Sequence, residues 1–154
     1  MSGLDDLYRQ IILDHSKSRH GAGLEGTEPP PGTHTGSSHQ INPTCGDQIT
    51  LRVAVTDGTV SQVRWDGAGC AISMAAASVL SELAEGMPVA DLRHTIDDFR
   101  DVMRSRGTVE ADEEVLGDAA AFVGVSKFPA RVKCAMLAWV AAEHALAEAE
   151  VAAA

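Results

Sequence analysis

The sequence predicts an α+β fold in which a three-stranded antiparallel sheet packs against helices, with an N-terminal helix and a long C-terminal helix. Residues 49–56 alternate between apolar and polar side chains, as a half-buried strand does, and Asp57 and Gly58 directly after them form a hairpin-turn signal. Helical periodicity precedes this hairpin and returns from residue 71 onward. Because the strands are grouped and do not alternate with helices, their sheet is expected to be antiparallel.

The N-terminal part combines a helix and a connector. Apolar residues recur at helical spacing from Leu4 to Ile12, and Asp5 lies in the first turn, where the helix macrodipole favours an acid. The expected helix covers residues 3–16. Three consecutive prolines and several glycines then predict an extended connector over residues 21–36.

The expected sheet has residues 49–56 as its central strand. Residues 59–65 form the return strand of the hairpin, and residues 37–42 supply a third strand at the edge.

Helices follow the sheet. An apolar stripe predicts a helix that begins at residue 71, and Gly86 followed by Pro88 ends it. A second helix begins at Pro88 and carries apolar residues on one face. The polar stretch 105–114 predicts a loop or short insertion.

The last expected helix covers residues 129–149 and has a proline in its first turn. Its first half is apolar most of the way round, so we expect it to be buried against the sheet.

Length and charge narrow the class of protein. The 154 residues are expected to form one domain, 1–154. A formal charge of −10 argues against non-specific nucleic-acid binding and favours neutral or basic protein partners. Apolar runs stay well below the roughly 20 residues that span a bilayer, and residues 1–20 lack the apolar segment of a secretory signal. We therefore expect a cytoplasmic protein without a membrane or nucleic-acid partner.

Three cysteines carry the candidate chemistry, and their odd number and wide spacing argue against a disulfide framework. Cys45 lies in a Pro/Gly turn before a strand, and Asp47 follows two residues later. Cys70 opens a helix, whose N-terminus favours a thiolate. Cys134 lies inside the last helix, and Arg131 precedes it on the same face, where a guanidinium would stabilise a thiolate or persulfide.

Spacing alone leaves two uses of the cysteines open. Three thiols and one carboxylate form a plausible tetrahedral set for Zn²⁺, although the wide separations resemble neither a zinc finger nor a zinc ribbon. Alternatively, Cys70 and Cys134 are small buried hydrophobic residues. Cys45 fits this second interpretation least, because a Pro/Gly turn is normally exposed.

Three blocks, each containing one cysteine, resemble the signature blocks of the IscU-like family of iron–sulfur cluster assembly proteins. They are residues 42–47 (NPTCGD), 67–73 (GAGCAIS) and 128–135 (FPARVKCA), and they occur in the family's order. The resemblance implies an antiparallel three-stranded sheet covered by helices, in agreement with the pattern of the residues.

Two details are similar to the SufU-type branch of that family. Lys133 stands where classical scaffolds have histidine, which removes a potential cluster ligand, and the stretch 100–118 is lengthened as in SufU-type proteins. The resemblance therefore implies a zinc-dependent sulfurtransferase. Its Zn²⁺ ligands would be Cys45, Asp47, Cys70 and Cys134.

The same resemblance implies a mechanism and partners. SufU-type proteins work with a pyridoxal-phosphate cysteine desulfurase of the SufS type and supply sulfur to downstream iron–sulfur assembly proteins. Cys45 would accept the persulfide sulfur after a histidine of the desulfurase replaces it on zinc, and Arg131 would assist.

Two other functions remain as alternatives. An iron–sulfur cluster scaffold would use the same thiolates to hold iron or a cluster, and a non-catalytic adaptor would use zinc for structure alone. For Arg131 the alternative is a salt bridge. The six histidines lie outside the three blocks and are expected at surface or packing positions, with His34 and His39 as reserve ligands at most. Trp65 and Trp139 are expected in the core.

Overall fold

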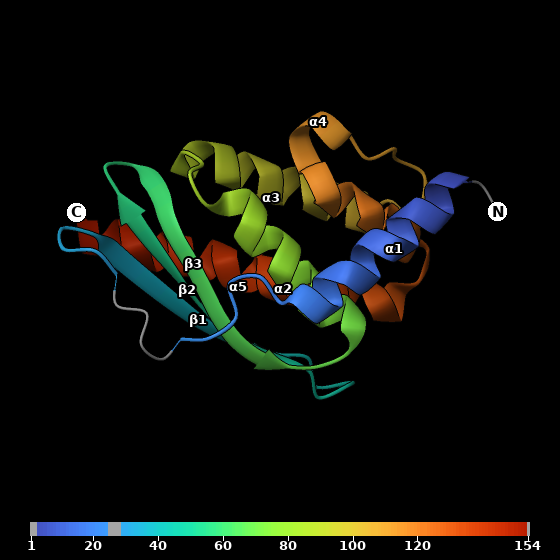
Figure 1. The fold of residues 1–154 in the computed structure, drawn as a ribbon, viewed down its shortest axis with the longest axis horizontal. Coiled ribbons are helices and arrows are strands. Elements are labelled where there is room, and N and C mark those ends of the chain that lie inside the picture. The colour runs from blue at the N-terminus through green and yellow to red at the C-terminus, as the bar shows by residue number, and fades with distance from the viewer. Residues whose placement is uncertain (1–2, 25–28, 154) are drawn as a thin grey trace.

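A meander of three strands forms the sheet (Figure 1). In this computed structural model, which describes residues 3–24 and 29–153, the strands β1 (His34–Ile41), β2 (Gln48–Thr56) and β3 (Thr59–Ala68) pair antiparallel in that order. Asp57 and Gly58, at the β2–β3 turn, have φ values of 51° and 77°, as a tight hairpin requires. The predicted three-stranded antiparallel sheet is confirmed.

The strands differ in their ends from the sequence-based prediction. β1 begins at His34 and not at residue 37, and β3 continues to Ala68 and not to residue 65. The backbone ladder extends these strands, because His34 at the start of β1 pairs with Val55, and Ala68 at the end of β3 pairs with Gln48. Hydrogen bonding along a ladder does not need apolar alternation, which is the only signal that the sequence offers there.

Helices cover one face of the sheet and lie beyond one of its ends (Figure 1). α5 packs against β1 and β2, and α2 packs against α1, α5 and β3. The predicted burial of the last helix against the sheet is confirmed. The main helices are α1 (Gly3–Ser18), α2 (Ala71–Ala84), α3 (Val89–Arg104) and α5 (Pro129–Ala153).

The stretch between α3 and α5 is more regular than the sequence indicated. The loop predicted over residues 105–114 is wrong at its end, because Glu113 and Glu114 belong to a short helix, α4 (Glu113–Leu116). The Asp112 carboxylate accepts the backbone N–H of Glu114 at 3.0 Å and starts that helix. A 3₁₀ segment, η1 (Gly117–Lys127), follows; it was not predicted.

Only part of the stretch 21–36 is the extended connector that the sequence predicted. Residues 21–24 run beside β3, where the Trp65 N–H donates to the Gly21 carbonyl at 3.0 Å and the Gly23 N–H donates to the Trp65 carbonyl at 2.7 Å. Residues 34–36 belong to β1, and residues 25–28 lie outside the described part.

Aromatic side chains fill the core between the sheet and the helices. Trp139 of α5 stacks on Phe99 of α3 with ring centroids 4.0 Å apart, and Phe99 meets Phe122 edge to face. Trp65 and Trp139 are both fully buried, so their predicted place in the core is confirmed. Within residues 3–24 and 29–153, none of the helices has the length and apolar character that crossing a membrane requires.

Candidate metal centre

The three cysteines come from two connections and one helix that meet at one end of the sheet. Cys45 lies in the β1–β2 turn, Cys70 lies between β3 and α2, and Cys134 lies in the second turn of α5. The β1–β2 turn and the end of β3 share this end because Gln48 pairs with Ala68. The fold therefore brings together three thiols that are far apart in sequence.

Three of the four predicted ligands converge closely. One donor atom from each of Cys45, Asp47 and Cys134 lies within 4.8 Å of the other two, and the Sγ atoms of Cys45 and Cys134 are 3.9 Å apart. Cys70 lies beside this group, close enough to contribute to the pKa shifts of both Asp47 and Cys134. Its Sγ is also 3.5 Å from the Ser73 hydroxyl.

The turn that carries Cys45 is closed by backbone hydrogen bonds. The Asn42 N–H donates to the Asp47 carbonyl and the Gly46 N–H donates to the Asn42 carbonyl, each at 2.8 Å. Gly46 has a φ of 78°, which glycine adopts without strain. Both ends of the turn are thereby fixed, while Cys45 remains exposed at its tip.

Asp47 is buried and held as a carboxylate. Burial alone would raise its pKa, but hydrogen bonds from the Ser73 hydroxyl, from the Cys70 and Cys45 thiols and from the Cys70 backbone outweigh burial and lower the pKa. The strongest of these is the Ser73 hydroxyl, which donates to Asp47 Oδ2 at 2.5 Å. Gly69 permits this packing, because a Cβ there would lie 2.8 Å from the Asp47 carboxyl carbon.

Cys134 is a protonated thiol in the absence of a cation. Burial, followed by hydrogen bonding and charge from Cys70 and Cys45, raises the pKa of the Cys134 thiol to about 12. Thiolate is the form that binds metal, so a bound cation would have to drive deprotonation at neutral pH.

The donor set fits zinc. Soft thiolates with one carboxylate suit Zn²⁺, and two sulfur ligands of a tetrahedral zinc stand about 3.8 Å apart when Zn–S is ~2.3 Å. The 3.9 Å between Cys45 and Cys134 agrees with that separation. Cys70 lies at the edge of the cluster and would have to move closer to the other three donors for all four to bind one zinc ion.

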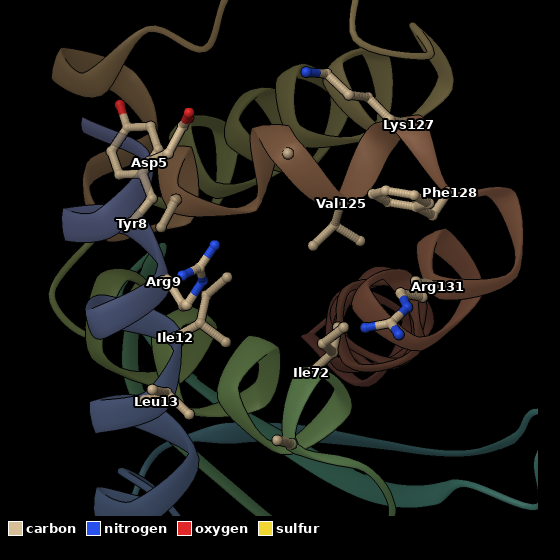
Figure 2. Close-up of a pocket in the computed structure, with 13 residues that line it drawn as sticks. Asp5, Tyr8, Arg9, Ile12, Leu13, Ile72, Val125, Lys127, Phe128 and Arg131 are labelled. Atoms are coloured by element: carbon tan, nitrogen blue, oxygen red, sulfur yellow. The ribbon is translucent and has the colours of Figure 1, made fainter. Parts of the chain in front are cut away.

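Arg131 lies one turn before Cys134 in α5. It is exposed in the first turn of α5, and its side chain lines a cavity between α1 and η1 (Figure 2). Within the described residues its guanidinium forms no ion pair, so the salt bridge weighed as its alternative role is not formed there.

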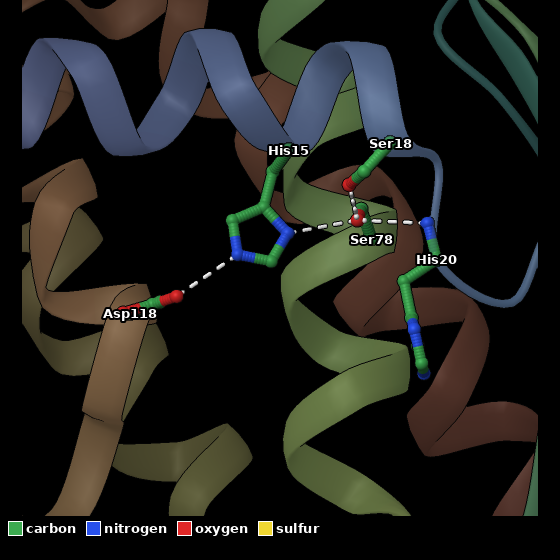
Figure 3. Close-up of polar contacts among 5 residues, drawn as sticks. All are labelled: His15, Ser18, His20, Ser78 and Asp118. Atoms are coloured by element: carbon green, nitrogen blue, oxygen red, sulfur yellow. Dashed lines mark hydrogen bonds and ion pairs between the residues drawn. The ribbon is translucent and has the colours of Figure 1, made fainter.

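A second cluster has a structural role. His15 of α1 is buried, with Nδ1 2.8 Å from the Ser78 hydroxyl of α2 and Nε2 2.9 Å from Asp118 of η1 (Figure 3). Glu82 lies nearby, with a carboxylate oxygen within 4.8 Å of donor atoms of His15 and Asp118. Both ring nitrogens of His15 already have partners, so this side chain joins three elements, as the expected packing role requires.

Ser73 and Gly69 belong to the second cysteine block, but the sequence did not predict that either would contact Asp47. Ser73 follows Cys70 by three residues, and this spacing places both side chains on one side of the first turn of α2. This spacing was the one signal in the sequence that could have placed Ser73 near the cysteine cluster. The position of Asp47 against Gly69 is a contact between the β1–β2 turn and the end of β3 that no local pattern indicates.

Comparison with known proteins assigns the fold and the three blocks to one family. Residues 7–135 match the family described as the NifU-like N terminal domain. The chain is 37% identical to the zinc-dependent sulfurtransferase SufU of Bacillus subtilis (strain 168), over 97% of this chain and 95% of that protein. It is 33% identical to the iron–sulfur cluster assembly scaffold protein IscU of Streptococcus pyogenes serotype M1, over 95% of this chain and 86% of that protein.

Solved structures agree with this assignment. A crystal structure from Fervidobacterium islandicum AW-1, described as an iron–sulfur cluster assembly scaffold protein for the SUF system, superposes with a TM-score of 0.74 at 31% identity. It matches 89% of this chain and 94% of its own. The N-terminal NifU-like protein of Brucella abortus gives a TM-score of 0.80 over 97% and 99% of the two chains, and its 24% identity supports the fold alone.

Proposed function

The chain belongs to the NifU-like N-terminal domain family, and on that premise we propose that it is a zinc-dependent sulfurtransferase of iron–sulfur cluster assembly. The observation that carries the proposal is the thiol cluster. Cys45 is exposed at the tip of a turn, yet its Sγ is 3.9 Å from that of the buried Cys134 and adjacent to the Asp47 carboxylate. A group placed in this way is both reachable by a partner and held in a metal-binding set.

Each residue of the cluster has a proposed role. Cys45, Asp47, Cys70 and Cys134 would hold Zn²⁺, which, when bound, supplies the positive charge that keeps the thiols deprotonated at neutral pH. Cys45 is the proposed sulfur acceptor because it is exposed and belongs to the converging group, whereas Cys70 is exposed but lies outside that group. Cys134 lies within a helix and is buried, so it is suited to holding a fixed position.

The proposed transfer exchanges one sulfur–sulfur bond for another. The Cys45 thiolate attacks the terminal sulfur of a cysteine persulfide on the partner. A new S–S bond forms at Cys45 while the partner's S–S bond breaks, and the partner's cysteine leaves as a thiolate. No net oxidation occurs, so no further reactant is needed. The partner that carries such a persulfide is a cysteine desulfurase, and the transfer is proposed to take place in the reducing cytoplasm.

Arg131 is proposed to act after the partner has bound. Its guanidinium is exposed one turn before Cys134 and has no ion pair among the described residues, so it is available to an anionic sulfur brought in from outside. Arg131→Lys should retain part of the transfer rate and Arg131→Ala less.

A scaffold is the second candidate, since the similarity to the IscU of Streptococcus pyogenes is nearly as extensive. Lys133 favours the sulfurtransferase function, here called the relay, over the scaffold function. Its ammonium is exposed beside Cys134 and is a poor ligand at neutral pH, so only the three cysteines and Asp47 remain for a cluster. Aerobically purified protein separates the two: colourless protein with one zinc supports the relay, and brown protein with bound iron and sulfide supports the scaffold.

The experiment that tests the relay follows sulfur. The zinc-loaded chain is incubated with a SufS-type desulfurase and radiolabelled cysteine, and the label on the peptide containing Cys45 is measured under non-reducing conditions. We expect label on Cys45 and none after Cys45→Ser. If Cys45→Ser still accepted label and still stimulated the desulfurase, Cys45 would not be the acceptor. Zinc content and desulfurase binding are measured for both proteins, so that loss of transfer is not confused with loss of the site.

A further inference from the structure

A partly apolar cavity lies next to the thiol cluster. It has a volume of about 590 Å³, within the range of ~300–1,000 Å³ that is typical of ligand pockets. Figure 2 shows side chains of α1 on one side of it and those of η1 and the start of α5 on the other. Its apolar wall includes Ile12, Leu13, Ile72, Val125 and Phe128. Leu13 and Phe128 are 41% and 57% exposed, so the mouth of the cavity is also apolar.

The cavity is positively charged in an otherwise acidic chain. Residues 119–142 contain three cations, Lys127, Arg131 and Lys133, and no acid, whereas the whole chain has a formal charge of −10. The charged residues that line the cavity are three cations, Arg9, Lys127 and Arg131, and one acid, Asp5, so cations are in excess. Within the described residues Lys127 and Arg131 form no ion pair. An occupant that fits this surface therefore combines an apolar group with a carboxylate.

The cavity is lined by residues that are neighbours of the thiol cluster along the chain. Ala71 and Ile72, which line it, directly follow Cys70, and Arg131 lies one turn before Cys134. A protein that covers Cys70 in order to reach the thiol cluster would therefore also come close to residues that line this cavity.

We propose that the cavity is a docking site for the cysteine desulfurase, which inserts an apolar side chain flanked by a carboxylate. This inference rests on the proposed sulfur transfer and adds a second point of contact to it. The thiol cluster carries the chemistry, and the cavity supplies affinity and orientation. Apolar anchors in pockets with a charged rim often dominate the binding energy of an interface.

Gly124 offers a direct test because a side chain can be added there without disturbing the fold. It lines the cavity, it has no positive φ, and a Cβ at this position would meet no atom within 4 Å. Gly124→Leu should therefore fill the cavity and leave the thiol cluster unchanged. Gly3→Leu is the matched control, since Gly3 also faces open space but lies outside the cavity.

Charge is tested separately with Lys127→Glu. Its control is Arg93→Glu, which makes the same change in net charge in the α3 turn that follows Val89, near the β2–β3 hairpin and away from the cavity. Arg93 pairs with Glu150 at 2.5 Å, but both side chains are 46% exposed, so loss of this surface ion pair should cost little stability. Added salt should weaken desulfurase binding by the parent more than binding by Lys127→Glu. Salt screens the attraction between Lys127 and the partner's carboxylate, and the variant no longer has that attraction.

The measurement is desulfurase activity titrated with each zinc-loaded variant. We expect Gly124→Leu and Lys127→Glu each to raise the half-saturating concentration about tenfold, as loss of one interface anchor does, with an unchanged rate at saturation. Both controls should titrate like the parent. Circular dichroism and zinc content identify any variant that has lost its fold, and the other variant then decides.

This design distinguishes failure of the proposed docking site from failure of the proposed function. If both cavity variants titrate like the parent while Cys45→Ser abolishes transfer, the cavity is not the docking site and the proposed function stands. If Cys45→Ser transfers sulfur normally, the proposed function itself is wrong.

Discussion

Replacing Ser73 with alanine is expected to destabilise the metal-free protein through a single buried carboxylate. Ser73 is 1% exposed, Asp47 is 5% exposed, and the hydroxyl donates to the carboxylate at 2.5 Å. A hydrogen bond to a charged group contributes about 1.5–3 kcal/mol to stability. For a chain of this length a loss of about 2 kcal/mol lowers Tm by roughly 4–8 °C.

The effect of this substitution should also depend on pH. The folded-state pKa of Asp47 is lowered, so the stabilisation is present above the ordinary aspartate pKa of about 3.9 and is lost as the pH falls through the folded value. The difference between Ser73→Ala and the parent should therefore be largest near neutral pH and shrink in acid.

The assay is urea unfolding of the chelated proteins, followed by far-UV circular dichroism at several pH values. Ser81→Ala is the matched control, because Ser81 lies in the same helix, is fully buried, and donates only to the Ala77 carbonyl of that helix. We expect the control to lose less than about 1 kcal/mol. Equal losses for Ser73→Ala and Ser81→Ala would refute a special role for the bond to Asp47. In the metal-bound form, loss of this supporting hydrogen bond should weaken zinc binding about 10–100-fold.

Three further predictions concern other parts of the fold. The chain has one tyrosine, so an absorbance titration reports Tyr8 alone; the midpoint should be about 12, because its hydroxyl donates to Glu113, and Glu113→Gln should return it toward about 10. A midpoint near 10 in the folded protein would exclude that bond. Gly36→Ala should lower the free energy of unfolding by about 1–3 kcal/mol, since its Cβ would lie 1.9 Å from the Ala145 carbonyl oxygen and push α5 off β1; Gly3→Ala should show no such loss. Zinc removal should lower Tm yet preserve the helical dichroism signal, because the aromatic core does not depend on the cysteines; an unfolded spectrum after chelation would show that metal is required for folding.

The order of the main elements could be predicted from the sequence because it depends on local periodicity. Alternation in residues 49–56 and the turn at Asp57 and Gly58 specify the hairpin, and the apolar first half of residues 129–149 specifies a buried helix. α4 was not predicted because its four residues have too few turns to produce a periodic signal. η1 was not predicted because residues 119–125 are apolar or glycine without a polar interruption, so no helical period is visible there.

The candidate ligands could be identified from sequence only through the three blocks, since spacing left the cysteines open to other uses. The structure then adds what spacing could not: a 3.9 Å separation of the Cys45 and Cys134 sulfurs, and a hydroxyl of Ser73 that holds Asp47 as a carboxylate. It also places Arg131 in the wall of a cavity.

The amino-acid sequence by itself determines the strands, the long helices and the residues able to act as thiol or carboxylate donors, because these follow from side-chain chemistry and from neighbours within a few positions. The meeting of Cys45 with Cys134, and the cavity beside them, are decided only when α5 packs across the sheet and past the β1–β2 turn. Those contacts join residues that are distant in the chain, and their distances are set by packing of the whole core, which no local pattern encodes.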